Sequence, residues 1–191
     1  MRDDTLLSEL LNAETELEAV AALEKRKLLG SPDRWRYLGD MPNNQSIVHA
    51  QQSSPTAALI EKYTNGVDAV LLRQCKTRGI DPRSPSAPRS MSIAIEEYFG
   101  DFSDRTSPSG GYSAEQLREF SESSLVLYAT GSKERPSLSF FDAGEGQLPE
   151  NFPTTFCSLI HGTAGGSYKG AIPFVQGRFN MGSSGVLLTC H

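Results

Sequence analysis

The chain has 191 residues, of which 38% are hydrophobic, so it is long enough to bury the core of one domain. Its net charge of −5, from 18 basic and 23 acidic residues, argues against a broad nucleic-acid-binding surface. Three cysteines without close spacing argue against a disulfide framework or a zinc knuckle. The N-terminus does not resemble a signal peptide, and no apolar run approaches the roughly 20 residues that span a bilayer. We therefore expect a soluble, cytoplasmic protein with no membrane partner.

The first predicted element is one long amphipathic helix from Asp3 to Leu29. Apolar residues recur along it every three or four positions, and an aspartate can cap its start. Gly30-Ser31-Pro32 ends the pattern. We interpret residues 1–32 as an N-terminal helical arm, which packs either on its own domain or on a second chain.

A second helix is predicted to begin at Ser54-Pro55, with the serine as cap and the proline at the first helical position, and to run to about Lys76. The mixed stretch before it contains one predicted strand, Gln45–Ala50. After it, residues 77–113 are rich in proline, serine and glycine, which predicts an irregular insertion.

Short elements are predicted in the rest of the chain. They are helices at Ile93–Phe99 and Ala114–Ser121, strands at Leu125–Ala129 and Ser137–Phe141, and a helical piece near Phe152–Ile160. Their order indicates an α+β sandwich with helices on one face of a mixed or antiparallel sheet.

Polar side chains form a stripe along the second helix. Glu61, Asn65 and Asp68 are spaced by four and three residues, which places them on one face. A solvated helix face would show the same pattern, but a carboxylate one turn from a carboxamide can also hold a water and Mg²⁺. Gly66 costs the helix about 1 kcal/mol relative to alanine, which indicates a close approach there.

The stretch FFDAGEG places an acid at the end of a predicted strand and two glycines after it. Asp142 needs hydrogen-bond donors if it is buried, and the exocyclic amine of a purine is one candidate. Gly144 and Gly146 would let the backbone approach a flat ring or adopt positive φ. A simple tight turn is the alternative.

The third motif is GRFNMGSSG, in which Gly177, Gly182 and Gly185 precede the apolar run VLL. Glycines before a helix start expose amide groups that attract phosphate. The motif is neither a Walker loop nor a dinucleotide fingerprint, and a flexible linker is the alternative.

Together, and in this order, the three motifs resemble the GHKL or Bergerat-fold ATPases, the superfamily of gyrase B, Hsp90, histidine kinases and MutL. The resemblance covers residues 45–191 and places the ATP-binding domain at residues 33–191. It implies a two-layer sandwich that binds ATP and Mg²⁺ beneath a mobile lid, here residues 147–176. Among members of the superfamily, the chain is most similar to bacterial Hsp90-like ATP-binding proteins, some of which act in antiviral defence or DNA handling.

The resemblance also implies roles for individual residues. Glu61 matches the general base that activates water, Asn65 the Mg²⁺ ligand, and Asp142 the acid that binds the adenine amine. The other matched nucleotide-binding positions are Asp68, Gly144, Gly146, Lys169, Gly177, Phe179, Gly182 and Gly185. Lys169, in the lid, either reaches the γ-phosphate or is solvated, and Arg178 and His161 are similarly ambiguous.

Family domains continue past the third motif with further strands, whereas this sequence stops at His191, so we expect an N-terminal portion of a longer protein or an unusually completed sheet. The expected function is an ATP-hydrolysing conformational or dimerisation switch, working as a homodimer or as a partner subunit, with nucleic acid contacted only through other parts. One alternative is a non-catalytic nucleotide-sensing or scaffold module. A histidine kinase domain is a weaker alternative, because those kinases usually lack a glutamate at the position of Glu61.

Overall fold

The computed structural model describes residues 4–40, 42–44, 46, 48, 54–100, 112–134, 136–155, 157 and 168–177. In this part of the chain it shows an α+β arrangement, with helices and one antiparallel pair of strands. The helices are α1 (Asp4–Asn12), α2 (Glu16–Lys25), α4 (Pro55–Thr77), α5 (Met91–Phe99) and α6 (Ala114–Ser123). The strands are β1 (Leu125–Gly131) and β2 (Pro136–Asp142).

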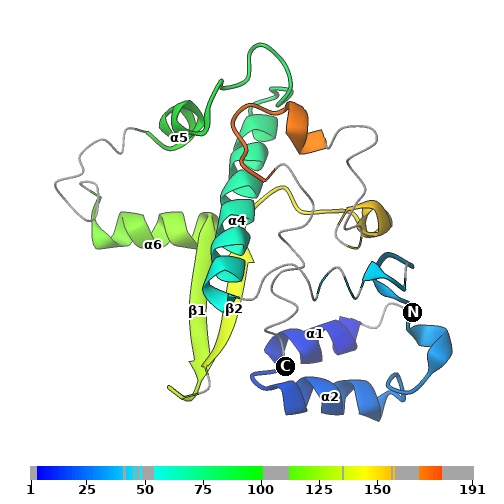
Figure 1. Ribbon diagram of the computed structural model, residues 1–191. Coiled ribbons are helices and arrows are strands. Elements are labelled where there is room, and N and C mark those ends of the chain that lie inside the picture. The colour runs from blue at the N-terminus through cyan, green and yellow to red at the C-terminus, as the bar shows by residue number, and fades with distance from the viewer. Residues whose placement is uncertain are drawn as a thin grey trace.

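Helix α4 is the longest described element, and the strands, α5 and the segment 168–177 lie along it (Figure 1). The predicted start is confirmed: the Ser54 hydroxyl accepts a hydrogen bond from the Ala57 amide, and Pro55 opens the helix. Helices α5 and α6 also begin at the caps that their sequences contain, Ser90 and Ser113.

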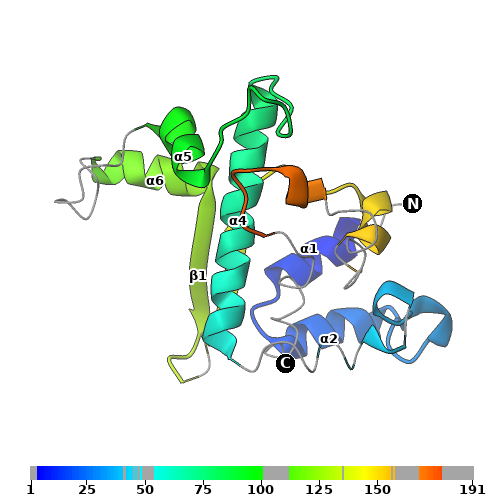
Figure 2. The ribbon, with the colours of Figure 1, turned by 45° about the horizontal axis from the view of Figure 1, so that its top comes forward.

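The prediction of one long N-terminal helix is wrong. The helix breaks after Asn12, and Thr15 caps α2 by accepting a hydrogen bond from the Glu18 amide. The Glu18 carboxylate in turn accepts a hydrogen bond from the Glu14 amide at 2.8 Å. These local bonds replace the helical ones lost at the break, so the chain turns back and α2 lies beside α1 (Figure 2).

The predicted strand at Gln45–Ala50 is also wrong where the structure describes it. The backbone is helical at Asn44, Ser46 and Val48. Two of these side chains, Asn44 and Val48, are buried, so tertiary contacts outweigh a weak local strand preference.

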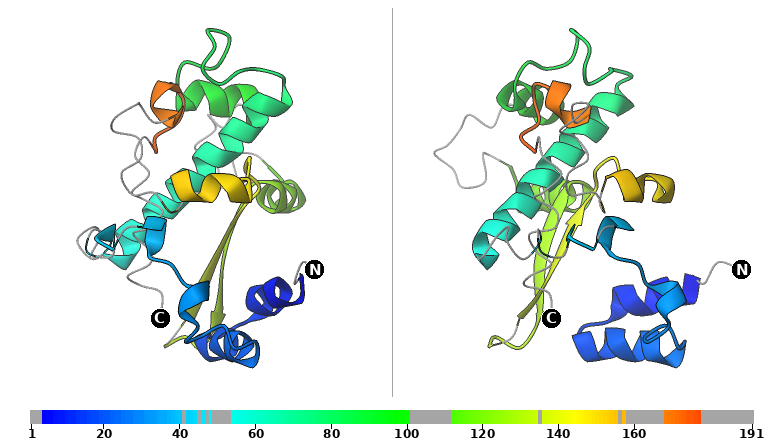
Figure 3. Two further views of the ribbon diagram at one scale, coloured as in Figure 1. Left: turned by 90° about the vertical axis from the view of Figure 1, so that its right-hand side faces the viewer. Right: turned by 45° about the vertical axis from the view of Figure 1, so that its right-hand side comes forward.

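Strands β1 and β2 pair antiparallel, in a register that runs from Leu125 opposite Asp142 to Gly131 opposite Pro136. Helix α4 packs on this pair (Figure 3). Gly66 lies at this contact. A Cβ atom at Gly66 would lie 2.6 Å from Leu125 Cδ2 and 2.7 Å from Phe140 Cζ. The close approach predicted at Gly66 is therefore an approach of α4 to the sheet. Because glycine has no side chain, the helix and the strands pack more closely, and this packing offsets the low helix propensity of glycine.

The main core lies at the C-terminal half of α4. Its buried members are Leu71, Leu72, Cys75, Ala87, Ala94, Tyr98, Ile172, Phe174 and Val175. Residues 78–90 are irregular, as predicted for the insertion at residues 77–113, and the helix predicted within it at Ile93–Phe99 is confirmed as α5. The insertion also contributes Ala87 and α5 to this core. Hydrogen bonds define a turn there: the Asp81 carboxylate accepts one from the Arg83 amide, and the Asp81 carbonyl accepts one from the Ser84 amide at 2.9 Å.

A short 3₁₀ helix at Pro149–Thr154 covers the start of the predicted helical piece at Phe152–Ile160, of which residues 156 and 158–160 lie outside the described residues. Within the described residues, no helix combines the length and apolar character needed to cross a membrane.

Candidate functional site

The candidate site is built on the polar stripe of α4. Glu61 and Asn65 are half-buried, and Asp68, one turn further along, has no exposed surface. Two segments that are distant in sequence reach this helix: the loop after β2 and the segment that ends at Gly177. At Asn65 and Asp68 the stripe is therefore covered by other segments and is not a solvated helix face.

Asp68 binds the backbone of the second segment. Its Oδ1 accepts a hydrogen bond from the Gln176 amide at 3.0 Å, and its Oδ2 accepts one from the Gly177 amide at 2.7 Å. Gln176 N also lies 3.2 Å from Oδ2. Both oxygens of the Asp68 carboxylate thus accept hydrogen bonds from the protein backbone. The predicted contact of Asp68 with a nucleotide stays a prediction.

Gly177 lies directly against Asn65. A Cβ atom at Gly177 would lie 2.6 Å from Asn65 Oδ1 and 3.0 Å from Asp68 Oδ2. The bare Cα therefore makes room for the carboxamide, and any side chain at this position would displace it. The Gly177 amide is donated to Asp68, so this glycine contributes shape to the site.

Asp142 ends β2 and is exposed, and its Oδ1 accepts a hydrogen bond from the Gly144 amide at 3.1 Å. The alternative of a tight turn is therefore realised, with the second carboxylate oxygen left outside that bond. Gly144 packs on α4: a Cβ atom there would lie 2.4 Å from Ala69 Cβ and 2.9 Å from the Ala69 carbonyl carbon. Gly144 thus makes a close approach to the helix, and its approach to a flat ring stays a prediction.

Two basic side chains of α4 hold the same loop. Arg73 donates a hydrogen bond to the Ala143 carbonyl at 2.7 Å, and Lys76 forms an ion pair with Glu145. The sequence motifs do not reveal these contacts. Their only local signal is a pair of cations three residues apart on the helix that carries the first motif.

Gly146 has a φ of +65° and open space around its Cα, so the backbone conformation requires glycine there. Lys169 is half-buried on a 3₁₀ turn, Tyr168–Ala171, that precedes the core residue Ile172. The remaining predicted positions, Phe179, Gly182 and Gly185, lie outside the described residues, as do His161 and Arg178.

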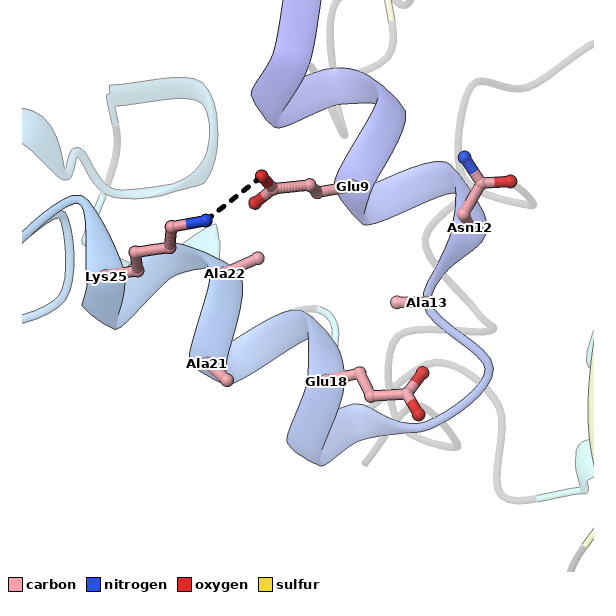
Figure 4. Close-up of a pocket in the computed structure, with 7 residues that line it drawn as sticks. All are labelled: Glu9, Asn12, Ala13, Glu18, Ala21, Ala22 and Lys25. Atoms are coloured by element: carbon pink, nitrogen blue, oxygen red, sulfur yellow. Dashed lines mark hydrogen bonds and ion pairs between the residues drawn. The ribbon is translucent and has the colours of Figure 1, made fainter.

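A pocket of about 410 Å³ lies elsewhere, between α1 and α2 (Figure 4). Its lining includes Glu9 and Lys25, whose ion pair is 3.5 Å long, and Glu9 also binds Arg26 at 2.5 Å. Arg26, then Lys25, hold the pKa of Glu9 below its usual value. Glu9 and Lys25 are thus engaged with charged partners, Glu18 accepts a hydrogen bond from the Glu14 amide, and no motif residue lines the pocket.

No three His, Cys, Asp or Glu side chains gather as a metal site within the described part of the chain. A cation at Asn65 would therefore need further oxygen ligands from a substrate and from water, which is the usual pattern for Mg²⁺ bound with phosphates. Comparisons of the chain with protein-family models, with curated proteins and with solved structures gave no match.

Proposed function

We propose that this chain is an ATP-binding, Mg²⁺-dependent ATP-hydrolysing domain of the Bergerat-fold type, and that it acts as a conformational or dimerisation switch in a larger bacterial protein. One observation carries the proposal. Gly144 and Gly177, from motifs that are remote in sequence, both contact the first motif, on α4. They do so at Ala69 and at Asn65, one helical turn apart.

The chemistry of hydrolysis falls to the half-buried pair on α4. Glu61 is the residue that would accept a proton from the water attacking the γ-phosphate, a role that typically contributes 10²- to 10⁴-fold to the rate. Asn65 would hold Mg²⁺, whose positive charge offsets the charge of the phosphates. The contact with Gly177 holds the Asn65 carboxamide beside the end of the lid. This position suits a Mg²⁺ ion that binds both Asn65 and the phosphates.

Recognition of the base falls to Asp142. Its Oδ1 is engaged by Gly144, so the loop holds the carboxylate in one orientation. The other oxygen would accept a hydrogen bond from the exocyclic amine of adenine. Guanine and hypoxanthine carry a carbonyl at that position, so the proposal includes a preference for ATP over GTP and inosine triphosphate.

Calorimetric titration with Mg²⁺-ATP tests the proposal on the wild type, Asp142→Asn and Glu61→Ala. Asparagine keeps an oxygen for the Gly144 amide, so the turn is retained while the negative charge is lost. We expect Asp142→Asn to weaken binding at least tenfold, and Glu61→Ala to bind within about twofold but to lose turnover by roughly 10²-fold or more. Glu119→Gln, an exposed carboxylate on α6, is the matched control and should behave like the wild type.

Absence of Mg²⁺-ATP binding by the wild type would contradict the proposal, as would unchanged affinity in Asp142→Asn. Binding with a normal Asp142 effect but no turnover in the wild type would instead favour the non-catalytic nucleotide-sensing module.

A further inference from the structure

We propose that Asp68 is a positioning residue, which anchors the Gly177 end of the lid on α4 and so sets the position of Asn65. The consequence for nucleotide binding rests on the proposed function, whereas the anchoring itself does not. The proposal replaces a direct contact between Asp68 and a ligand.

The burial of Asp68 is the first argument. A carboxylate with no exposed surface is costly unless donors surround it. None of the ion pairs among the described residues includes Asp68. The donors are instead two successive backbone amides, of Gln176 and Gly177, which converge on the carboxylate. The charge is thus stabilised by one short piece of backbone, and its position is tied to that piece.

The place of this contact along the chain is the second argument. Ile172, Phe174 and Val175 are buried in the core and hold the segment without Asp68. Gln176 is exposed, so hydrophobic burial stops at the preceding residue. Asp68 therefore acts where the core no longer holds the chain, and an Asp68 variant keeps the apolar contacts that precede it.

The third argument links the anchor to Asn65. Gly177 donates its amide to Asp68 and presents its bare Cα to the Asn65 carboxamide. Release of the amide would move the Cα away from Asn65, so the two contacts depend on one another. The anchor should consequently influence the phosphate and Mg²⁺ end of a nucleotide, while the Asp142 loop is held separately by Arg73 and Lys76.

Limited proteolysis with trypsin tests the anchor without any ligand. The bond after Arg178 directly follows the anchored residues in sequence. Asp68→Ala should be cleaved there at least tenfold faster than the wild type. Asp68→Asn should be intermediate, because one oxygen is replaced by a donor that faces the Gln176 amide. Lys76→Ala, on the same helix, is the control and should be cleaved at the wild-type rate. Equal cleavage of Asp68→Ala and wild type would overturn the anchor.

Nucleotide affinity then separates positioning from a general structural role. Asp68→Ala should weaken Mg²⁺-ATP binding at least tenfold and adenosine binding less than twofold, because only the phosphate end depends on the anchor. A parallel loss of both affinities would overturn the positioning role. If the wild type binds neither compound, the proposed function fails, and the cleavage rates alone then decide whether Asp68 is the anchor.

Discussion

Helix α4 holds two segments by different physical means. At Asp68 the contact is fully buried and joins a carboxylate to backbone amides. Two turns further along, Lys76 and Glu145 form an ion pair whose side chains are 46% and 22% exposed. Water competes for the second contact and not for the first. We call them the buried anchor and the surface anchor, and the difference in exposure indicates that the Asp68 contact is stronger than the Lys76–Glu145 contact.

The largest effect is expected from removing the buried anchor. Asp68→Ala leaves two amides without an acceptor, and hydrogen bonds to charged groups are worth about 1.5–3 kcal/mol each. Relief of the buried charge offsets part of this loss. We expect the free energy of unfolding to fall by about 2–4 kcal/mol, against less than about 1 kcal/mol for Lys76→Ala. Urea denaturation of both variants measures the difference, and equal losses would remove the distinction between the anchors.

Alanine substitutions at Gly144 and Gly177 should have opposite orders of effect on stability and on Mg²⁺-ATP affinity. Gly144→Ala would push a methyl group into Ala69, including its backbone, so we expect a loss of about 1–3 kcal/mol. Gly177→Ala meets mainly the end of the Asn65 side chain, which can rotate, so the loss should be smaller. Mg²⁺-ATP affinity should instead fall more in Gly177→Ala. Thermal unfolding and calorimetry test the pair; a greater destabilisation by Gly177→Ala would contradict the packing described for Asn65.

Salt provides a smaller effect. A double-mutant cycle over Lys76→Ala and Glu145→Ala should give a coupling energy of about 0.2–1 kcal/mol at low ionic strength. At 1 M salt the Debye length is about 3 Å, so this coupling should largely vanish. The destabilisation by Asp68→Ala should persist at 1 M salt, because the buried contact is screened much less. A salt-resistant coupling at the surface anchor would show that it is less hydrated than its exposure indicates.

At neutral pH the smallest change in the free energy of unfolding is expected from Tyr98→Phe. Tyr98 takes part in neither anchor, so this variant serves as a reference. The Tyr98 hydroxyl is buried and has no hydrogen-bond partner among the described residues, so Tyr98→Phe should change the free energy of unfolding by less than about 1 kcal/mol at pH 7. Burial, then the neighbouring Cys75, raises the pKa of Tyr98 above its usual value near 10.

The sign of the pH effect follows from this shift. The unfolded chain loses the Tyr98 proton at a lower pH than the folded protein does, so the stabilisation is complete below pH 10 and declines as the pH rises further. Wild type should therefore lose stability between about pH 10 and 11 more steeply than Tyr98→Phe. Urea titrations at pH 7 and across that interval test this, and parallel curves would contradict it.

Local sequence patterns predicted much of the secondary structure. The start of α4 was predicted from its serine cap, and both strands were predicted from apolar residues between turn signals. Ser90 and Ser113 cap α5 and α6, although the prediction placed the start of α5 two residues late, at Ile93. The break after Asn12 was also encoded locally, in Thr15 and Glu18, but continuous apolar spacing over the same residues predicts one helix. The apolar spacing and the capping residues therefore gave conflicting predictions. Apolar spacing alone does not show that a helix ends and a second one begins within the same pattern.

The sequence alone determined which residues share a face of α4, because helix geometry relates neighbours within two turns. It also indicated that Gly66 and Gly144 allow close approaches, and it assigned Gly177 to a loop that attracts phosphate. What approaches them was decided only by the tertiary structure: the strands, Ala69 and Asn65. The same holds for Asp68, whose donors lie 108 and 109 residues away. Spacing in sequence carries no information about such partners, because the folded core, not the local backbone, brings them together.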